Sequence, residues 1–160
     1  MKQLMCLFLL SSFVSKGQTF TLADTVFKVN DVMRTYRIVP NINNNEYIML
    51  ESRPFLDSLA KFLIKNKNLV IEIGNYTDFR GTDKVTLMLS QARSRSVMRY
   101  LVDERSIAIN RLVSMGYGET NPLISQEKIE KMKDPATIRL AHRINVRTEL
   151  KILSVDYLQQ

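Results

Sequence analysis

Apolar residues recur at helical spacing in two stretches of the chain. In the first stretch they fall at positions i, i+3, i+4, i+7 and i+8, which predicts an amphipathic helix over residues 52–66 with Pro54 in its first turn. In the second stretch, over residues 82–103, the expected buried stripe places Arg93 at its edge. The two sets of positions are Leu56, Leu59, Ala60, Leu63 and Ile64, and Val85, Leu89, Ala92, Ser96, Tyr100 and Leu101.

The rest of the pattern predicts strands and one polar excursion. The expected strands are residues 31–39, 69–73 and 112–117, and a strictly alternating, half-exposed strand over residues 144–152. Residues 125–140 form a polar, partly helical excursion that Pro135 interrupts. Two helices alternate with strands before two strands follow each other, which predicts a layered α/β sandwich with helices on one face of the sheet. The pattern leaves the strand order open.

The N-terminal residues have the layout of a secretory signal peptide. Lys2 precedes an eleven-residue apolar core, and Ser15 and Gly17 place small residues at the −3 and −1 positions of a cut before residue 18. Cys6 lies ahead of most of that core, so it does not fit a lipid-attachment cysteine. We therefore expect an exported chain whose signal peptide is residues 1–17.

Composition narrows the possible classes of protein. The 160 residues are 45% hydrophobic and 24% charged, close to the average of globular domains, which excludes wholesale disorder. No apolar run reaches the roughly 18–20 residues that a membrane-spanning helix needs. One cysteine and one histidine exclude disulfides, CxxC metal sites and multi-histidine metal sites. The formal net charge of +7 leaves acidic partners open: nucleic acid, anionic lipid or an acidic polymer.

One segment places chemically distinctive residues at a specific spacing. Residues 77–94 read TDFRGTDKVTLMLSQARS. This segment resembles TDxxGxxxxNxxLSxxRA, the signature of the OmpA-like peptidoglycan-binding family, which also includes the MotB and peptidoglycan-associated lipoprotein domains. Thr86 stands where the family has Asn, and Ser94 where it has Ala.

Three further segments agree with that family in the same order along the chain. Residues 111–122 resemble its RLxxxGyGexxP, and residues 40–43 weakly resemble its FDxN. Residues 145–147 stand where the family has NRR, with Val146 replacing the first arginine and removing one cation. Each motif is weak alone, but the ordered set covers nearly the whole chain after the signal peptide.

The resemblance implies both a fold and a function. The fold is a βαβαββ sandwich, an α+β domain with helices on one face of a mixed four-stranded sheet, over residues 37–155 after a lead-in at residues 18–36. The function is binding of the peptide stem of peptidoglycan without hydrolysis in the periplasm, where the domain links or scaffolds the outer envelope, with an outer-membrane or envelope protein as a further partner. The resemblance implies no cofactor.

The resemblance also implies a binding site. Asp78 and Arg93 match the pair that grips the free amino-acid end of diaminopimelate, where one carbon carries an ammonium and a carboxylate. A fixed carboxylate accepts hydrogen bonds from the ammonium, and a planar guanidinium binds the carboxylate with two. The other contacts expected at matched positions are Asn43, Thr77, Thr86, Asn145 and Arg147.

Other classes of function fit less well. The sequence contains no GxSxG, P-loop or GxGxxG motif, so we do not expect an enzyme. Basic side chains on the second predicted helix and in residues 125–140 could bind an anionic polymer or lipid, although the signal peptide argues against nucleic acid. The changes at Pro40, Thr86 and Val146 leave open a periplasmic adaptor that keeps the fold and binds a partner protein instead.

Overall fold

The computed structural model of the protein describes residues 17–38 and 48–157. The expected signal peptide therefore lies almost wholly outside the described residues, and so does Asn43 with the segment 40–43. Within the described ranges, no helix combines the length and the apolar character needed to cross a membrane.

The described chain is built from strands and helices around one sheet. They are β1 (Val32–Thr35), α1 (Arg53–Lys65), β2 (Val70–Tyr76), α2 (Asp83–Arg99), β3 (Leu112–Gly116), α3 (Gln126–Glu130), α4 (Pro135–Asn145) and β4 (Arg147–Ser154). Short 3-10 turns at Leu50–Ser52 and Ile109–Arg111 precede α1 and β3, and a π-helical turn at Tyr100–Glu104 follows α2.

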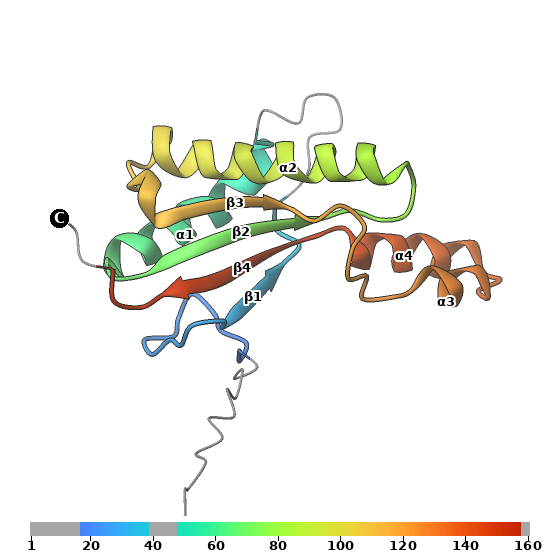
Figure 1. The fold of residues 1–160 in the computed structure, drawn as a ribbon, viewed down its shortest axis with the longest axis horizontal. Coiled ribbons are helices and arrows are strands. Elements are labelled where there is room, and N and C mark those ends of the chain that lie inside the picture. The colour runs from blue at the N-terminus through green and yellow to red at the C-terminus, as the bar shows by residue number, and fades with distance from the viewer. Residues whose placement is uncertain (1–16, 39–47, 158–160) are drawn as a thin grey trace, which may run out of the picture.

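The sheet is mixed, with the strand order β1-β4-β2-β3 (Figure 1). β2 and β3 run parallel, whereas β4 is antiparallel to both β1 and β2. The chain order confirms the expected βαβαββ fold, with α3 and α4 inserted before the last strand. β1 is shorter than the strand expected over residues 31–39, and β2 extends beyond the one expected over residues 69–73.

The hydrophobic core lies between the helices and one face of the sheet. Leu56, Leu59 and Leu63 of α1 are almost completely buried, as the periodicity predicts, whereas Ile64, predicted on the same face, is 54% exposed at its edge. They share one core with alternate residues of the two central strands: Ile71, Ile73, Leu150 and Ile152. Burial of these side chains supplies most of the free energy that holds α1 on the sheet.

The segment before β1 also belongs to this core. The Phe20 ring is buried and stacks on Phe62 of α1 with 6.0 Å between ring centroids. The Asp31 carboxylate accepts hydrogen bonds from the backbone N–H groups of Gln18 and Lys28, which closes the segment into a loop. The lead-in expected over residues 18–36 is therefore part of the folded unit, because its aromatic side chain and β1 both complete the domain.

The buried face in the first turns of α2 differs from the expected one. Val85, predicted on the buried stripe, is 56% exposed, and the buried line there runs along Thr86, Ser90 and Ser94. Towards the end of the helix, Ser96, Tyr100 and Leu101 are buried as predicted. The periodicity of large apolar residues is misleading here because small hydroxyl side chains make the contact with the sheet. The Ser94 hydroxyl donates to the Ile73 carbonyl, and the Ser90 hydroxyl accepts from the Gly118 N–H at 2.9 Å.

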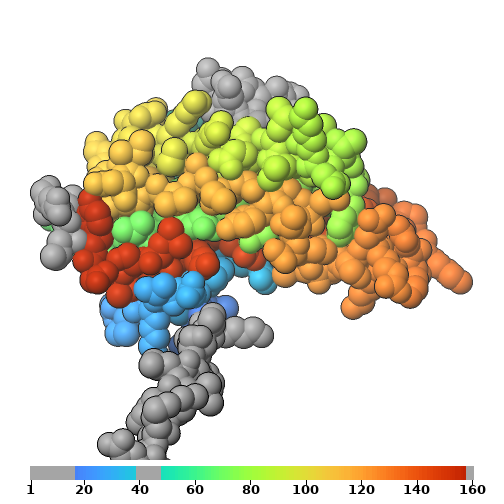
Figure 2. Space-filling model, viewed as in Figure 1, coloured from blue at the N-terminus to red at the C-terminus, as the bar shows by residue number. Residues whose placement is uncertain are grey.

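The polar excursion expected over residues 125–140 forms α3 and α4, which project from one end of the domain (Figures 1 and 2). Pro135 begins α4 rather than interrupting a helix, because proline fits a first helical turn. Asp134 caps that turn by accepting a backbone N–H at 2.8 Å. Ile144, which the alternation predicts in the last strand, lies at the end of α4.

The close contact between α2 and β3 generates a test of the fold. A Cβ atom added at Gly116 would lie 2.3 Å from the backbone nitrogen of Gln91, and a backbone atom cannot rotate away. We expect Gly116→Ala to lower the free energy of unfolding by about 1–3 kcal/mol in urea denaturation. Met115→Ala is the matched control, because Met115 lies next to it and is partly exposed. Equal stability of the two variants would contradict this account.

Candidate functional site

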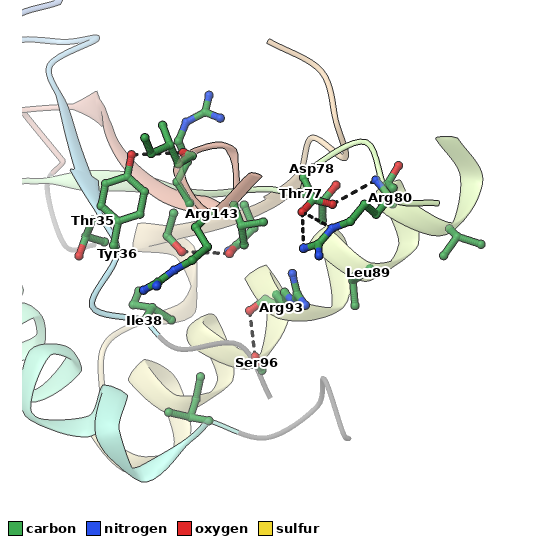
Figure 3. Close-up of a pocket in the computed structure, with 18 of the residues that line it drawn as sticks. Thr35, Tyr36, Ile38, Thr77, Asp78, Arg80, Leu89, Arg93, Ser96 and Arg143 are labelled. Atoms are coloured by element: carbon green, nitrogen blue, oxygen red, sulfur yellow. Dashed lines mark hydrogen bonds and ion pairs between the residues drawn. The ribbon is translucent and has the colours of Figure 1, made fainter. Parts of the chain in front are cut away.

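A cavity of about 820 Å³ opens between α2, the end of β2 and the C-terminal end of α4 (Figure 3). Its polar wall includes Thr77, Asp78, Arg80, Arg93 and Arg143, and its apolar wall includes Val85, Leu89, Leu140 and Ile144. The Tyr36 hydroxyl donates to the Ile144 carbonyl at 3.3 Å, which ties the segment after β1 to the end of α4. The cavity thus has walls from distant parts of the chain.

Asp78 and Arg93 reach this cavity from consecutive elements. Asp78 follows the end of β2, and Arg93 lies in the middle of α2, which begins after the Thr82 cap. The Thr82 side chain accepts from the Val85 N–H at 3.4 Å. Because α2 then runs back along the sheet, both side chains line the same cavity although fifteen positions separate them. Figure 3 shows Arg93 pointing from the helix toward the Asp78 loop.

The Asp78 carboxylate is held by Arg80 rather than by Arg93. Its side chain is only 7% exposed, and it accepts from the Arg80 backbone N–H at 3.1 Å and from the Arg80 Nε at 2.8 Å. This hydrogen bonding raises the pKa of Arg80. The Arg80 side chain is 69% exposed and packs little against the protein, so its ion pair with Asp78 is the main contact that holds it. The Nδ1 atom of His142 lies 3.8 Å from the same carboxylate.

Arg93 is a partly desolvated cation that has no hydrogen-bond or ion-pair partner among the described residues. Its Nε atom is buried and has no hydrogen-bond partner within the part of the chain that the structure describes. Burial lowers the pKa of Arg93, and the nearby charge of Asp78 partly opposes that shift. An arginine remains protonated under all ordinary conditions, so this site holds a positive charge without a bound anion. A buried donor of this kind requires an explanation, and a ligand is one.

Two more polar atoms in the cavity share this property. The Thr77 hydroxyl and the Asn75 side-chain nitrogen are buried, and neither has a hydrogen-bond partner among the described residues. The Asn75 oxygen accepts from the Thr148 hydroxyl at 3.0 Å, which fixes the amide with its nitrogen available. Asn75 is not among the contacts predicted from the sequence. Its position two residues before Thr77, on the same face of an alternating strand, was the available signal.

Of the remaining residues predicted to contact the ligand, some line the cavity and others do not. Thr86 lines the cavity, and its hydroxyl donates to the Asp83 carbonyl at 3.0 Å. Asn145 does not line the cavity. Its amide instead pairs with the backbone of Ile124, accepting at 2.9 Å and donating at 2.8 Å, and so ties the excursion to the domain. Asn43 lies outside the described residues.

Arg147 lines the cavity, but its donors are bound within the protein. Its Nε donates to Glu149 at 2.8 Å, and its two terminal nitrogens donate to the carbonyls of Asn145 and Asn121 at 3.2 and 3.0 Å. The guanidinium also lies 3.7 Å from the centre of the Tyr76 ring. Only 3% of the side chain is exposed. These contacts give Arg147 a structural role in the sheet, and its predicted contact with a ligand stays a prediction.

The charges around the cavity leave an excess of cations. Arg80 pairs with Asp78, and Arg147 pairs with Glu149, which also accepts from Arg34. Arg93 and Arg143 line the cavity without a partner among the described residues. The cavity therefore suits a ligand that brings at least one anionic group and an ammonium for Asp78.

Comparison with known proteins gives one family and a group of related folds. The model of the OmpA family matches residues 41–134. The peptidoglycan-associated lipoprotein of Buchnera aphidicola is 32% identical over 85 residues, 53% of this chain and 49% of that protein. Outer membrane protein A of Bordetella avium is 36% identical over 81 residues, 50% of this chain and 41% of that protein. These matches span about half or less of the relatives' length.

Solved structures share the fold at lower sequence identity. The periplasmic domain of Helicobacter pylori MotB has a TM-score of 0.60 at 19% identity, covering 81% of this chain and 86% of that one. The peptidoglycan-associated lipoprotein of Burkholderia pseudomallei has a TM-score of 0.57 at 21% identity, covering 72% of this chain and 87% of that one. At this identity the likeness establishes the fold alone.

The bonding of Arg147 predicts a loss of stability when it is replaced. Arg147→Leu leaves two carbonyls without their donor and Glu149 with Arg34 alone, so we expect the free energy of unfolding to fall by about 2–4 kcal/mol. Urea denaturation measures this, with the exposed Arg139→Gln as the charge-matched control. Unchanged stability combined with lost ligand binding would instead make Arg147 a ligand contact, as the sequence pattern suggests.

Proposed function

This chain belongs to the OmpA family, and we propose that it binds the peptide stem of cell-wall peptidoglycan without cutting it. The observation that carries the proposal is that one cavity is lined by the buried Asp78 carboxylate and by Arg93, whose buried Nε has no partner in the described part of the chain. The family membership and the relatives named peptidoglycan-associated lipoprotein support the same conclusion.

The proposed ligand group is the zwitterionic end of diaminopimelate. Its ammonium would donate to Asp78, and its carboxylate would accept two hydrogen bonds from Arg93, which satisfies the buried Nε. The Thr77 hydroxyl and the Asn75 nitrogen offer further hydrogen bonds to the same group. The apolar wall of Val85, Leu89 and Ile144 suits the methylene chain behind it.

Binding of an ammonium at Asp78 requires Arg80 to leave. A terminal nitrogen of the Arg80 guanidinium lies 2.5 Å from the Oδ2 atom of Asp78, and the Arg80 side chain is mostly exposed to solvent. Only the Arg80 side of this pair is exposed, so the exchange has a low cost because the ligand ammonium replaces the guanidinium and keeps the buried Asp78 carboxylate paired. The Arg80 backbone N–H can keep its hydrogen bond to the other oxygen during the exchange.

The proposal predicts opposite effects of Arg93→Gln on binding and on stability. Removing one member of the pair that grips the zwitterion should cost roughly 2–5 kcal/mol of binding free energy, or on the order of 30- to several-thousand-fold in affinity. The free energy of unfolding should stay the same or rise, because a desolvated cation without a partner is removed. Retention on purified sacculi and urea denaturation measure the two quantities.

The companion variants sharpen this test. Asp78→Ala should abolish retention as Arg93→Gln does, and the double variant should lose little more, because both residues hold one ligand group. Arg80→Ala is the matched control, since it keeps both ligand-binding residues, and we expect it to bind at least as tightly as wild type. Intact retention in the Asp78 and Arg93 variants would contradict the site. Release of soluble fragments from the sacculi would contradict binding without hydrolysis.

We also propose that residues 1–17 direct export and are removed, which places the domain in the periplasm of a cell envelope. The relatives named outer membrane protein A and peptidoglycan-associated lipoprotein support an envelope location. We expect intact-mass measurement on an envelope fraction to give an N-terminus near Gln18. A protein that retains Met1, or that carries lipid on Cys6, would contradict this processing.

A further inference from the structure

Arg143 supplies a second cation to the cavity, from the wall opposite α2. It lies in the last turn of α4 and lines the cavity together with Leu140 and Ile144 of the same helix. Figure 3 shows its side chain extending across the mouth of the cavity toward Ile38. Across residues 17–38 and 48–157, no hydrogen bond or ion pair reaches its guanidinium. The last turn of α4 thus positions the Arg143 side chain in the cavity without an ion-pair partner among the described residues.

The positions around Arg143 contribute no other available cation. Val146, which lines the cavity three positions later, is apolar. Arg147 lines the cavity too, but it is held by Glu149 and by two backbone carbonyls. Arg143 is therefore the available cation on this wall among the described residues, and Arg93 is its counterpart on α2.

The wall that carries Arg143 is fixed in place. The Tyr36 hydroxyl donates to the Ile144 carbonyl at 3.3 Å, and the Asn145 amide pairs with the backbone of Ile124 in both directions. These contacts join the end of α4 to the segment after β1 and to the loop before α3. The backbone of Arg143 is thus anchored, while its long side chain remains able to adjust to a ligand.

We propose that Arg143 binds a second carboxylate of the ligand, separate from the one that Arg93 binds. This inference rests on the proposed function, because it names which stem peptides the same cavity prefers. Two guanidinium groups in one cavity repel each other, and Asp78, the only carboxylate that lines it among the described residues, is already paired. A ligand with two carboxylates relieves this repulsion, whereas one whose second carboxylate is amidated leaves Arg143 unpaired. The site therefore selects stem peptides with the second carboxylate free.

A pair of ligands isolates this contribution. One probe is a soluble stem tripeptide that ends in diaminopimelate with every carboxylate free. The other is the same peptide with the carboxylates outside the diaminopimelate zwitterion converted to amides. Titration calorimetry at one fixed ionic strength compares their affinities for wild type, Arg143→Gln, Arg93→Gln and the control Arg139→Gln, which removes an equal charge from the exposed surface of α4.

We expect Arg143→Gln to weaken binding of the free-acid peptide about three- to tenfold and to leave the amidated peptide unaffected. Arg93→Gln should weaken both peptides, and Arg139→Gln neither. The melting temperature of Arg143→Gln should match that of wild type, because the side chain has no partner within the described chain.

Equal effects of Arg143→Gln on both peptides, or no effect on either, would overturn the role of Arg143 while leaving the proposed function intact. The same loss with Arg139→Gln would reduce the effect to net charge and also overturn it. Failure of the wild-type protein to bind either peptide would instead contradict the proposed function itself.

Discussion

The close approach of α2 to the sheet is the contact on which the rest of the site depends. Ser90 and Ser94 of α2 are buried against the sheet, and Gly116 of β3 lies directly below the α2 backbone. A methyl group added at Gly116 would therefore collide with that backbone. Hydroxyl-to-backbone hydrogen bonds replace the large apolar contacts of an ordinary helix face. The separation between α2 and the sheet decides where Arg93 lies relative to Asp78, because Arg93 is on α2 and Asp78 follows β2 beneath it.

Arginines with the same chemistry have different roles because their surroundings differ. Arg147 is buried with every nitrogen bonded, so it joins the sheet to the excursion. Arg80 is exposed and pairs with a carboxylate that is not. Arg93 is partly buried and has an Nε without a partner in the described chain. An incompletely paired cation in a cavity costs folding free energy and lowers the cost of binding an anion, since part of the desolvation has already taken place.

The cavity combines this electrostatic arrangement with an apolar wall. Charged groups alone would bind many anions. Val85 and Leu89 favour a ligand that carries methylene groups behind its charged end, because those groups can pack against them. The Asp78 carboxylate adds a requirement for a cation close to the anion, and Arg143 adds one for a second anion. Each requirement excludes a class of competitor, so selectivity arises from the combination of groups rather than from the strength of any one contact.

The sequence by itself determined the order of elements, the apolar face of α1 and the joint placement of Asp78 and Arg93, because those follow from local periodicity and from a motif with fixed spacing. Only the tertiary structure decided which face is buried in the first turns of α2, because a contact between small residues leaves no signal in apolar periodicity. It also decided that Asp78 pairs with Arg80 and that Arg147 is bound internally. Those assignments depend on which carbonyls and carboxylates the fold brings within about 3 Å of each guanidinium, and no sequence spacing encodes that distance.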